Sequence, residues 1–353
     1  MRAAVFTDYG EPLEMREIDA PTADPSGVVV ETEACGICRS DWHAWQGDPL
    51  WAGRDFAEGH VFGHEPAGRV VEVGADVERV REGDHVCVPF NLSDGTCPSC
   101  RNGRANLCDN RVPLGLAPEA PGAFAEAVHV PDADQNVVAL PDAVSSVDMA
   151  GMGCRFMTAF HALAHRADVD PGDRVAVHGC GGVGLSAVHV ADALGATVVA
   201  VDLFDEKLAL AGDLGAAETV NATDVDSVSR TVRSITDGGA DVSVDALGVA
   251  DTCQNSVKSL RERGQHVQLG LTTREEGGGV TLPTDLMVVK EIEFVGSVGM
   301  PPARYDEIFR MIDAGKLDPA AVVSETVSLD RTSEKLAAMT DYDTVGIPVI
   351  DEF

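Results

Sequence analysis

Hydrophobic residues in the first 150 positions gather in short runs that are separated by stretches rich in Gly and Pro. Runs of this kind, bounded by turn residues, are typical of β-strands, and few stretches here show helical spacing. This part of the chain is therefore predicted to fold as a strand-rich, partly closed barrel with long loops. The predicted strands are Ala3–Phe6, Val28–Thr32, Gly68–Val73, His85–Pro89 and Phe124–Val130.

The pattern changes near Cys154, beyond which strand-like and helical segments alternate. Such alternation predicts a doubly wound sheet of parallel strands with helices on its faces, because parallel strands need a crossover connection. The predicted strands are Arg174–His178, Thr197–Val201, Val242–Ala246, His266–Leu269 and Ile292–Val295. The first two are followed by predicted helices over Gly184–Leu194 and Asp205–Leu214.

The last part of the chain has two helical patterns, Ala303–Ala314 and Thr332–Met339, and a strand-like end at Ile347–Ile350. A chain of 353 residues exceeds the usual size of a single hydrophobic core. We expect a first domain over residues 1–153, a second over 154–295, and a segment over 296–353 that returns to the first domain.

A glycine motif, Gly179-Cys180-Gly181-Gly182-Val183-Gly184, lies between the predicted strand and helix of the second domain. In this context the glycines allow a tight turn and let the backbone approach a pyrophosphate at the helix N-terminus. Asp202 ends the next strand, about 20 residues on, where a carboxylate can accept hydrogen bonds from a ribose diol. An acid there repels a 2′-phosphate, which favours NAD, with NADP as the alternative. The competing interpretation is a strand–turn–helix without a ligand.

Three residues far apart in the chain form a candidate zinc site: Cys38, His64 and Cys154, with Glu65 directly after the histidine. Two thiolates and one imidazole leave the fourth position of a tetrahedral zinc ion open. Catalytic zinc sites keep that position for water or substrate, whereas structural sites close it with a fourth protein ligand. The alternative is that the three residues never meet.

A second cluster, Asp94, Cys97, Cys100 and Cys108, has the spacing of a closed zinc site. Carboxylate oxygen is an acceptable zinc ligand, so Asp94 can complete a structural site in place of a fourth cysteine. The alternative is a degenerate lobe that no longer holds metal.

Cysteines with CxxC spacing favour metal binding over disulfides when a chain shows no secretory signal, and none is evident after Met1. The remaining cysteines, Cys35, Cys87, Cys180 and Cys253, lie in apolar or glycine-rich surroundings and are expected to be small core residues. No apolar run approaches the roughly 20 residues that span a bilayer. These observations predict a cytoplasmic protein with no membrane partner.

The chain is strongly acidic, with 58 acidic and 26 basic residues and a net charge of −32. The acids are scattered over the sequence, and only five of the basic residues are Lys. Repulsion on this scale destabilises a compact fold at low salt, whereas at ~1 M salt the Debye length is only ~3 Å. We expect a cytoplasm with molar salt, as in halophilic archaea, with an ordinary acidic mesophile as the alternative. The charge also argues against a nucleic-acid partner, since phosphate binding needs a basic surface.

Four motifs follow one another along the chain: Cys35–His43, Gly63-His64-Glu65, the Cys97/Cys100/Cys108 lobe and Gly153-Cys154. In this order they resemble the zinc-dependent alcohol dehydrogenases of the medium-chain dehydrogenase/reductase family. The resemblance runs essentially end to end. It implies a GroES-like catalytic domain joined to a Rossmann domain that binds NAD, and a homodimer or homotetramer.

The resemblance implies a role for each matching residue near the first metal. Cys38, His64 and Cys154 match the catalytic zinc ligands. Glu65 matches a carboxylate that can approach the metal when a ligand exchanges. Asp41 matches the acid that orients the zinc-bound imidazole, which is a common role for carboxylates around metal sites.

The proton and coenzyme contacts are implied in the same way. Ser40 matches the hydroxyl that takes the alcohol proton, and His43 the outer end of that relay. Arg39 matches a cation on the coenzyme pyrophosphate, and Asp202 and Lys207 the contacts to the adenosine ribose.

Phe90 matches a wall of the substrate pocket, which is otherwise built from loops such as 114–122 and 42–51. Trp42, Trp45 and Trp51 form an apolar mouth that favours alcohols in one interpretation, and simply pack in the other. The sequence departs from the family at Asp94 and at Gly346-Ile347-Pro348, where many members carry an arginine that reaches the pyrophosphate.

Together these features predict a zinc- and NAD-dependent dehydrogenase that oxidises a primary or secondary alcohol or reduces the corresponding carbonyl compound. A sugar, polyol or amino-alcohol dehydrogenase shares every motif. A third hypothesis is a non-catalytic NAD-binding protein, which would be expected to have lost a zinc ligand or the Ser40 hydroxyl.

Overall fold

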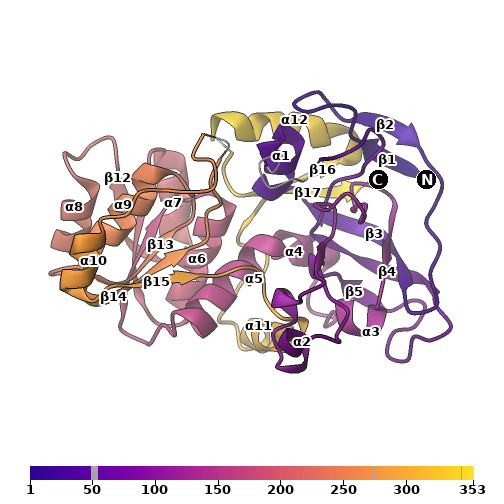
Figure 1. Ribbon diagram of the computed structural model, residues 1–353, viewed down its shortest axis with the longest axis horizontal. Coiled ribbons are helices and arrows are strands. Elements are labelled where there is room, and N and C mark those ends of the chain that lie inside the picture. The colour runs from indigo at the N-terminus through magenta and orange to yellow at the C-terminus, as the bar shows by residue number, and fades with distance from the viewer. Residues whose placement is uncertain (49–54, 274, 343) are drawn as a thin grey trace. The chain divides into compact units, whose positions relative to one another are not determined.

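The computed structural model describes residues 1–48, 55–273, 275–342 and 344–353 (Figure 1). These divide into two compact units, with unit 1 comprising Met1–Cys154 and Gly299–Phe353 and unit 2 comprising Arg155–Val298. Trp51 and the end of the predicted 42–51 loop lie outside the described residues.

Unit 1 is built on a seven-stranded sheet in which the C-terminal strand lies beside the first long strand. Val349 and Ile350 of that last strand pair antiparallel with Gly36 and Cys35, and Figure 1 shows the yellow β17 beside the violet β3. The sheet order is β16-β17-β3-β4-β5-β9, and β8 pairs with the other part of β3. The strands are β3 (Val28–Gly36), β4 (Pro66–Val73), β5 (His85–Cys87), β8 (Ala127–Val130), β9 (Val138–Ala139), β16 (Val323–Ser328) and β17 (Ile347–Glu352).

Aromatic rings pack against one another in the core of unit 1. Phe6 meets Phe62 and Phe56 edge-to-face at centroid distances of 5.4 Å and 6.4 Å. The N-terminal hairpin consists of β1 (Arg2–Val5) and β2 (Glu14–Glu17), and a second short pair consists of β6 (Asn91–Leu92) and β7 (Val112–Pro113). The α-helices of this unit are α1 (Arg39–Gln46), α2 (Pro98–Arg101), α3 (Ala133–Asn136), α4 (Ser146–Gly151), α11 (Tyr305–Asp313) and α12 (Thr332–Ala338).

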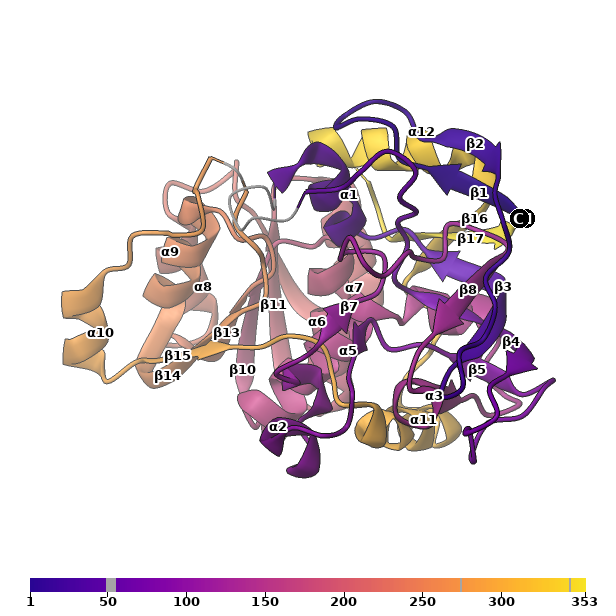
Figure 2. The same ribbon diagram turned by 45° about the vertical axis from the view of Figure 1, so that its right-hand side comes forward.

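Unit 2 is a six-stranded, all-parallel sheet in the order β12-β11-β10-β13-β14-β15 (Figure 2). The order reverses between β10 and β13, and open parallel sheets bind ligands at the carboxyl ends of the strands at such a switch point. The strands are β10 (Arg174–His178), β11 (Thr197–Asp202), β12 (Ala216–Asn221), β13 (Ala240–Asp245), β14 (Leu260–Gln268) and β15 (Glu293–Gly296). The helices are α5 (Cys154–His161, which begins at the unit boundary), α6 (Gly182–Ala193), α7 (Asp205–Asp213), α8 (Val228–Ile235), α9 (Ala250–Ser259) and α10 (Thr284–Lys290).

The predicted fold class, a strand-rich domain together with a doubly wound parallel sheet, is confirmed. Six strands were not predicted: β2, β6, β7, β9, β12 and β16. The two longest of these are β12 and β16. Each lies at the edge of its sheet and buries a single side chain fully, Val220 in one and Val327 in the other. A strand with so few inward-facing residues leaves almost no hydrophobic pattern in the sequence.

None of the described helices combines the length and the apolar character that crossing a membrane would require.

Candidate active site

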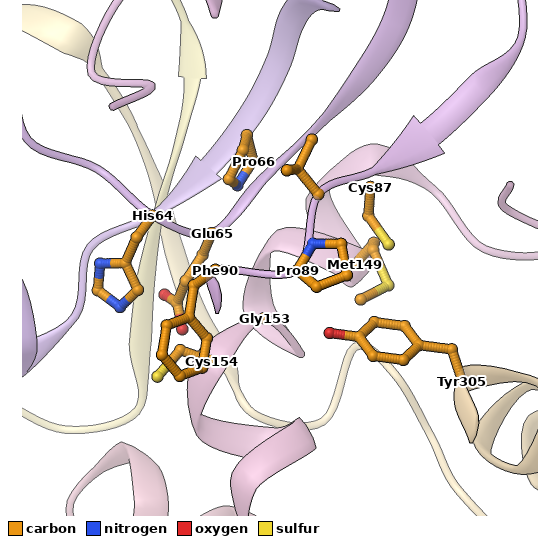
Figure 3. A pocket seen from close by; sticks show the side chains of 11 residues that line it. His64, Glu65, Pro66, Cys87, Pro89, Phe90, Met149, Gly153, Cys154 and Tyr305 are labelled. Atoms are coloured by element: carbon orange, nitrogen blue, oxygen red, sulfur yellow. The ribbon is translucent and has the colours of Figure 1, made fainter. Parts of the chain in front are cut away.

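The candidate zinc ligands meet in unit 1. The ligand atoms of Cys38, His64, Glu65 and Cys154 all lie within 4.8 Å of one another. Cys38 follows β3 and stands at the N-cap of α1, His64 and Glu65 directly precede β4, and Cys154 is the first residue of α5. Figure 3 shows His64, Glu65 and Cys154 converging from these elements. The possibility that the three residues never meet is excluded.

A single carboxylate, Asp41, joins the two segments that carry Cys38 and His64. Its Oδ1 accepts hydrogen bonds from His64 Nδ1 at 2.8 Å and from the Gly63 amide at 3.1 Å. Its Oδ2 accepts the Cys38 amide at 2.9 Å. Asp41 is fully buried. These contacts fix the tautomer of His64 with the proton on Nδ1, so that Nε2 presents a lone pair.

The other ring nitrogen of His64 is the observation that tests whether a metal fits here. Nε2 is buried and has no hydrogen-bond partner among the described residues. A buried polar atom without a partner costs free energy, and a metal bond would remove that cost. Burial lowers the pKa of His64, but the neighbouring Asp41 and Cys38 raise it well above its usual value. The same negative surroundings favour a metal cation, and the residues present fit zinc.

Glu65 lies against the metal cluster beside a small cavity. A Cβ atom at Gly153 would lie 2.5 Å from the Glu65 Cβ, so only glycine lets this carboxylate sit so close to Cys154. The cavity has room for about one water molecule, with a volume of about 10 Å³. The Tyr305 hydroxyl points towards it from α11 (Figure 3). Burial raises the pKa of Tyr305 well above its usual value, so its hydroxyl stays protonated.

The predicted pocket residue Phe90 lies next to His64, with the two rings edge-to-face at a centroid distance of 5.7 Å. Ser40 lies in the first turn of α1, and its Oγ is 3.8 Å from Cys38 Sγ. An apolar ring and a hydroxyl therefore stand beside the candidate metal position, as binding and deprotonating an alcohol would require.

His43 is nearly buried, and its Nδ1 lies 2.5 Å from the Oδ2 of Asp48. A His side chain bonded to a carboxylate is held in one orientation. The sequence carries no motif at Asp48, and this residue was not among the predicted site residues.

Arg39 is held between two aromatic rings. Its guanidinium lies 4.0 Å from the Trp42 ring centroid and 3.8 Å from that of Tyr342, and it donates to the Met339 carbonyl. Its Nη2 is buried with no hydrogen-bond partner among the described residues. Burial lowers the pKa of Arg39 from its ordinary value, although an arginine stays charged at neutral pH.

In unit 2 the glycine motif forms the turn from β10 into α6. Gly179 has a φ of +92°, which an L-residue rarely adopts, and a Cβ at Gly184 would lie 1.7 Å from the Gly179 carbonyl oxygen. At Gly181, the N-cap of α6, a Cβ would meet nothing within 4 Å in the described residues. The N-terminus of α6 therefore offers the open, amide-lined turn that accepts a pyrophosphate.

Asp202 ends β11 beside this turn and already binds the protein backbone. Its Oδ2 accepts the Cys180 amide at 2.6 Å, and its Oδ1 accepts the amides of Leu203 and Phe204 at 2.8 Å and 3.1 Å. Lys207 is buried on α7, with its Nζ 4.8 Å from the Phe204 ring centroid. Asp202 therefore shapes the glycine loop in addition to any contact with a ribose.

The second cluster also assembles, with the ligand atoms of Asp94, Cys97, Cys100 and Cys108 within 4.8 Å of one another. Cys97 Sγ lies 3.5 Å from Cys100 Sγ and 4.0 Å from Cys108 Sγ, and Cys108 Sγ is 3.3 Å from Asp94 Oδ1. With Zn–S bonds of about 2.3 Å, tetrahedral ligands stand roughly 3.8 Å apart. The donor set therefore fits a zinc ion, and the cysteines are free thiols.

The charges of this lobe are arranged for a cation. Amide hydrogen bonds from Asp109 and Cys100 lower the pKa of Cys97 to about 7, whereas burial raises the pKa of Cys100 to about 12. The side chain of Asn110 and both donors of Thr96 lower the pKa of Asp94, so this carboxylate is ionised at neutral pH. Before any metal binds, the Asp94 carboxylate is thus ionised and the Cys97 thiol loses its proton more readily than an ordinary cysteine.

Comparison with known proteins matches the chain to two family models, an alcohol dehydrogenase GroES-like domain over residues 24–142 and a zinc-binding dehydrogenase over 182–314. An NAD-dependent alcohol dehydrogenase of Sulfurisphaera tokodaii is 32% identical over 99% of both chains. A sorbitol dehydrogenase of Bacillus subtilis is 29% identical over 99% of this chain and 96% of its own. Among solved structures, an alcohol dehydrogenase from Thermus sp. ATN1 has a TM-score of 0.89 at 30% identity, covering 100% of each chain.

Proposed function

Because the chain belongs to the family of zinc-binding alcohol dehydrogenases, we propose that it transfers hydride between a primary or secondary alcohol and NAD, giving an aldehyde or ketone. The observation that carries this proposal is the buried, unpartnered Nε2 of His64 beside the sulfurs of Cys38 and Cys154. A zinc ion held by these three residues would act as a Lewis acid on the alcohol oxygen.

Within this scheme the chain's own residues bind the alcohol and move its proton. The ring of Phe90 forms a wall against the apolar part of the substrate. Ser40 takes the proton of the hydroxyl group, and His43 is the outer end of the relay. Glu65 would be placed to approach a bound metal ion when one of its ligands exchanges. Hydride transfer requires that this proton leaves first, because the alkoxide is the hydride donor.

The coenzyme is assigned to the glycine motif of unit 2, with NAD preferred over NADP because Asp202 opposes a 2′-phosphate. Lys207 is proposed to contact the ribose and Arg39 the pyrophosphate. Gly346-Ile347-Pro348 offers no cation there, so this function falls to Arg39. The first domain, residues 1–153 completed by 296–353, is proposed to carry catalysis. The second domain, residues 154–295, is proposed to bind the coenzyme.

The lobe of Asp94, Cys97, Cys100 and Cys108 is proposed to hold a second, structural zinc ion. Oxygen from Asp94 replaces the usual fourth sulfur, so we expect weaker binding than in an all-cysteine site.

A polyol or sugar is the second candidate substrate, because the sorbitol dehydrogenase relative covers nearly the whole chain. A screen of alcohols, polyols and sugars with NAD or NADP, in ~2 M KCl to screen charge, separates the two. A higher kcat/KM for simple alcohols with NAD supports the proposal. Activity confined to polyols supports the second candidate, and no zinc-dependent activity with any of them contradicts both.

We further propose a halophilic cytoplasmic setting, supported by the net charge of −32, and assembly as a homodimer or homotetramer. Val288 and Val289 on α10 are 77% and 81% exposed, and Leu271 and Phe294 are 65% and 44% exposed. Phe294 belongs to the edge strand β15, and an apolar sheet edge of this kind is a site for pairing with another copy. Light scattering in ~2 M KCl on the wild type and Val289→Glu tests this, since a monomeric wild type would contradict it.

A further inference from the structure

His43 and Asp48 form a buried acid–imidazole pair at the end of α1. His43 Nδ1 lies 2.5 Å from Asp48 Oδ2, and both residues are 8% exposed. The sequence builds this pair locally. Gly47 ends α1 with a φ of +77°, a left-handed conformation that glycine adopts without strain. This turn brings Asp48 back against the last turn of its own helix.

A carboxylate at the position of Asp48 is destabilising unless a partner compensates its charge. A negative charge near a helix C-terminus is opposed by the helix dipole, and burial adds the cost of desolvation. No other hydrogen bond to Asp48 occurs among the described residues. Asp48 also acts through space on the charge of the Arg39 guanidinium. His43 is therefore the hydrogen-bond partner that compensates the buried charge of Asp48.

The contact determines which nitrogen of His43 can accept a proton. A carboxylate only accepts hydrogen bonds, so the bond to Asp48 requires the proton of neutral His43 to lie on Nδ1. Nε2 is then the basic atom. The Trp42 ring, edge-to-face with His43 at a centroid distance of 5.1 Å, limits the other orientations of the imidazole.

We propose that Asp48 is a positioning residue for proton release: it holds His43 as the Nδ1–H tautomer, so that Nε2 receives the proton that leaves the alcohol. This inference rests on the proposed function, in which His43 ends the relay. The O–H bond of the alcohol breaks heterolytically, an N–H bond forms at Nε2, and that proton passes to bulk water. The Asp48 carboxylate, in contact with Nδ1, stabilises the imidazolium ion that forms.

The tautomer can be measured without any activity. In protein labelled with ¹⁵N-histidine, the shifts of the two ring nitrogens identify the protonated one, and His43→Gln assigns the signals. We expect Nδ1–H in the wild type and a shift towards Nε2–H in Asp48→Asn, whose amide can donate to Nδ1. A wild-type His43 protonated on Nε2 in the neutral ring would overturn the proposal, whether or not any variant folds.

Kinetics then test whether the pair acts on proton release. A general base contributes typically 10²–10⁴-fold, and we expect Asp48→Asn to lower kcat by about 10- to 100-fold, with zinc content and the NAD dissociation constant unchanged. Asp55→Asn is the matched control. It removes an equal charge from an exposed residue, seven positions further along the chain, that accepts a hydrogen bond from Tyr9 Oη.

A double-mutant cycle separates positioning from general damage. If Asp48 acts through His43, then Asp48→Asn causes no further loss of kcat in the His43→Gln background. An equal loss in both backgrounds would overturn the proposal. A wild-type enzyme without activity on any alcohol would instead contradict the proposed function, and the measured tautomer would still decide the pairing of His43 with Asp48.

Discussion

Replacing Asp41 by asparagine tests how far one carboxylate organises the metal site. The substitution keeps the shape but leaves one acceptor oxygen and introduces an NH₂ donor. If the amide oxygen takes the place of Oδ1, it keeps the bonds from His64 and Gly63, and the NH₂ then faces the Cys38 amide, donor against donor. The flipped orientation loses two bonds instead of one.

The structure gives the size of the effect. A hydrogen bond to a charged group contributes about 1.5–3 kcal/mol, and a buried donor left unpaired costs about 1–3 kcal/mol. The favoured orientation loses one such bond and leaves the Cys38 amide without an acceptor, so we expect the free energy of unfolding with bound zinc to fall by about 2.5–6 kcal/mol. Changes around metal ligands typically cost 10–100-fold in affinity, which corresponds to about 1.4–2.8 kcal/mol.

The assay is zinc competition against a chromophoric chelator, at constant high salt, for the wild type, Asp41→Asn and the exposed control Asp55→Asn. Urea unfolding with and without zinc measures the stability separately. We expect zinc affinity to fall about 10- to 100-fold in Asp41→Asn and to stay unchanged in the control. Zinc affinity within twofold of the wild type would refute the reasoning that Asp41 orients His64.

Three further predictions concern other parts of the chain. Asp94→Cys supplies a fourth sulfur to the lobe, and we expect it to slow zinc loss to a chelator and raise the Tm. Metal analysis that finds one zinc per active wild-type chain would contradict the second, structural zinc ion. Because the net charge is −32, the Tm should rise steeply up to about 1 M KCl, where the Debye length is ~3 Å, and a neutral osmolyte should not substitute; an unchanged Tm without salt would contradict the halophilic interpretation. Burial lowers the pKa of His178 to about 3. Between pH ~6.5 and ~3 the unfolded chain therefore binds a proton that the folded chain does not. The free energy of unfolding falls by about 1.4 kcal/mol for each pH unit as the pH drops through this window. Urea unfolding should show a shallower acid slope for His178→Gln than for the wild type, and identical slopes would contradict this assignment.

Sequence-based prediction was most accurate for sites whose residues lie close together in the chain. The strand Arg174–His178 and the glycine turn after it were predicted at their observed places, because a tight turn between a buried strand and a helix needs these residues in one short segment. The lobe of Cys97, Cys100 and Cys108 is local in the same way.

Other features depend on contacts that sequence spacing does not encode. That Cys38 and Cys154 share one cluster depends on the packing of α4, which ends shortly before Cys154, against β3 and β4, and it was inferred from residue types alone. Asp48 and Tyr305 were missed, because a lone acid after a glycine and a lone tyrosine at a helix start carry no pattern until their neighbours are known. The backbone contacts of Asp202 likewise follow from the geometry of the turn.

The most direct test of the central claim is alcohol-dependent reduction of NAD measured against zinc content, in wild-type protein and in Cys154→Ser. Sulfur is a soft zinc ligand and a serine hydroxyl a poor replacement, so we expect chelation to abolish turnover in the wild type and zinc to restore it, while NAD still binds throughout. Cys154→Ser should bind NAD with near-normal affinity and turn over no alcohol. Undiminished turnover by wild-type protein stripped of zinc, or by Cys154→Ser, would contradict the assignment of this cluster as the catalytic centre.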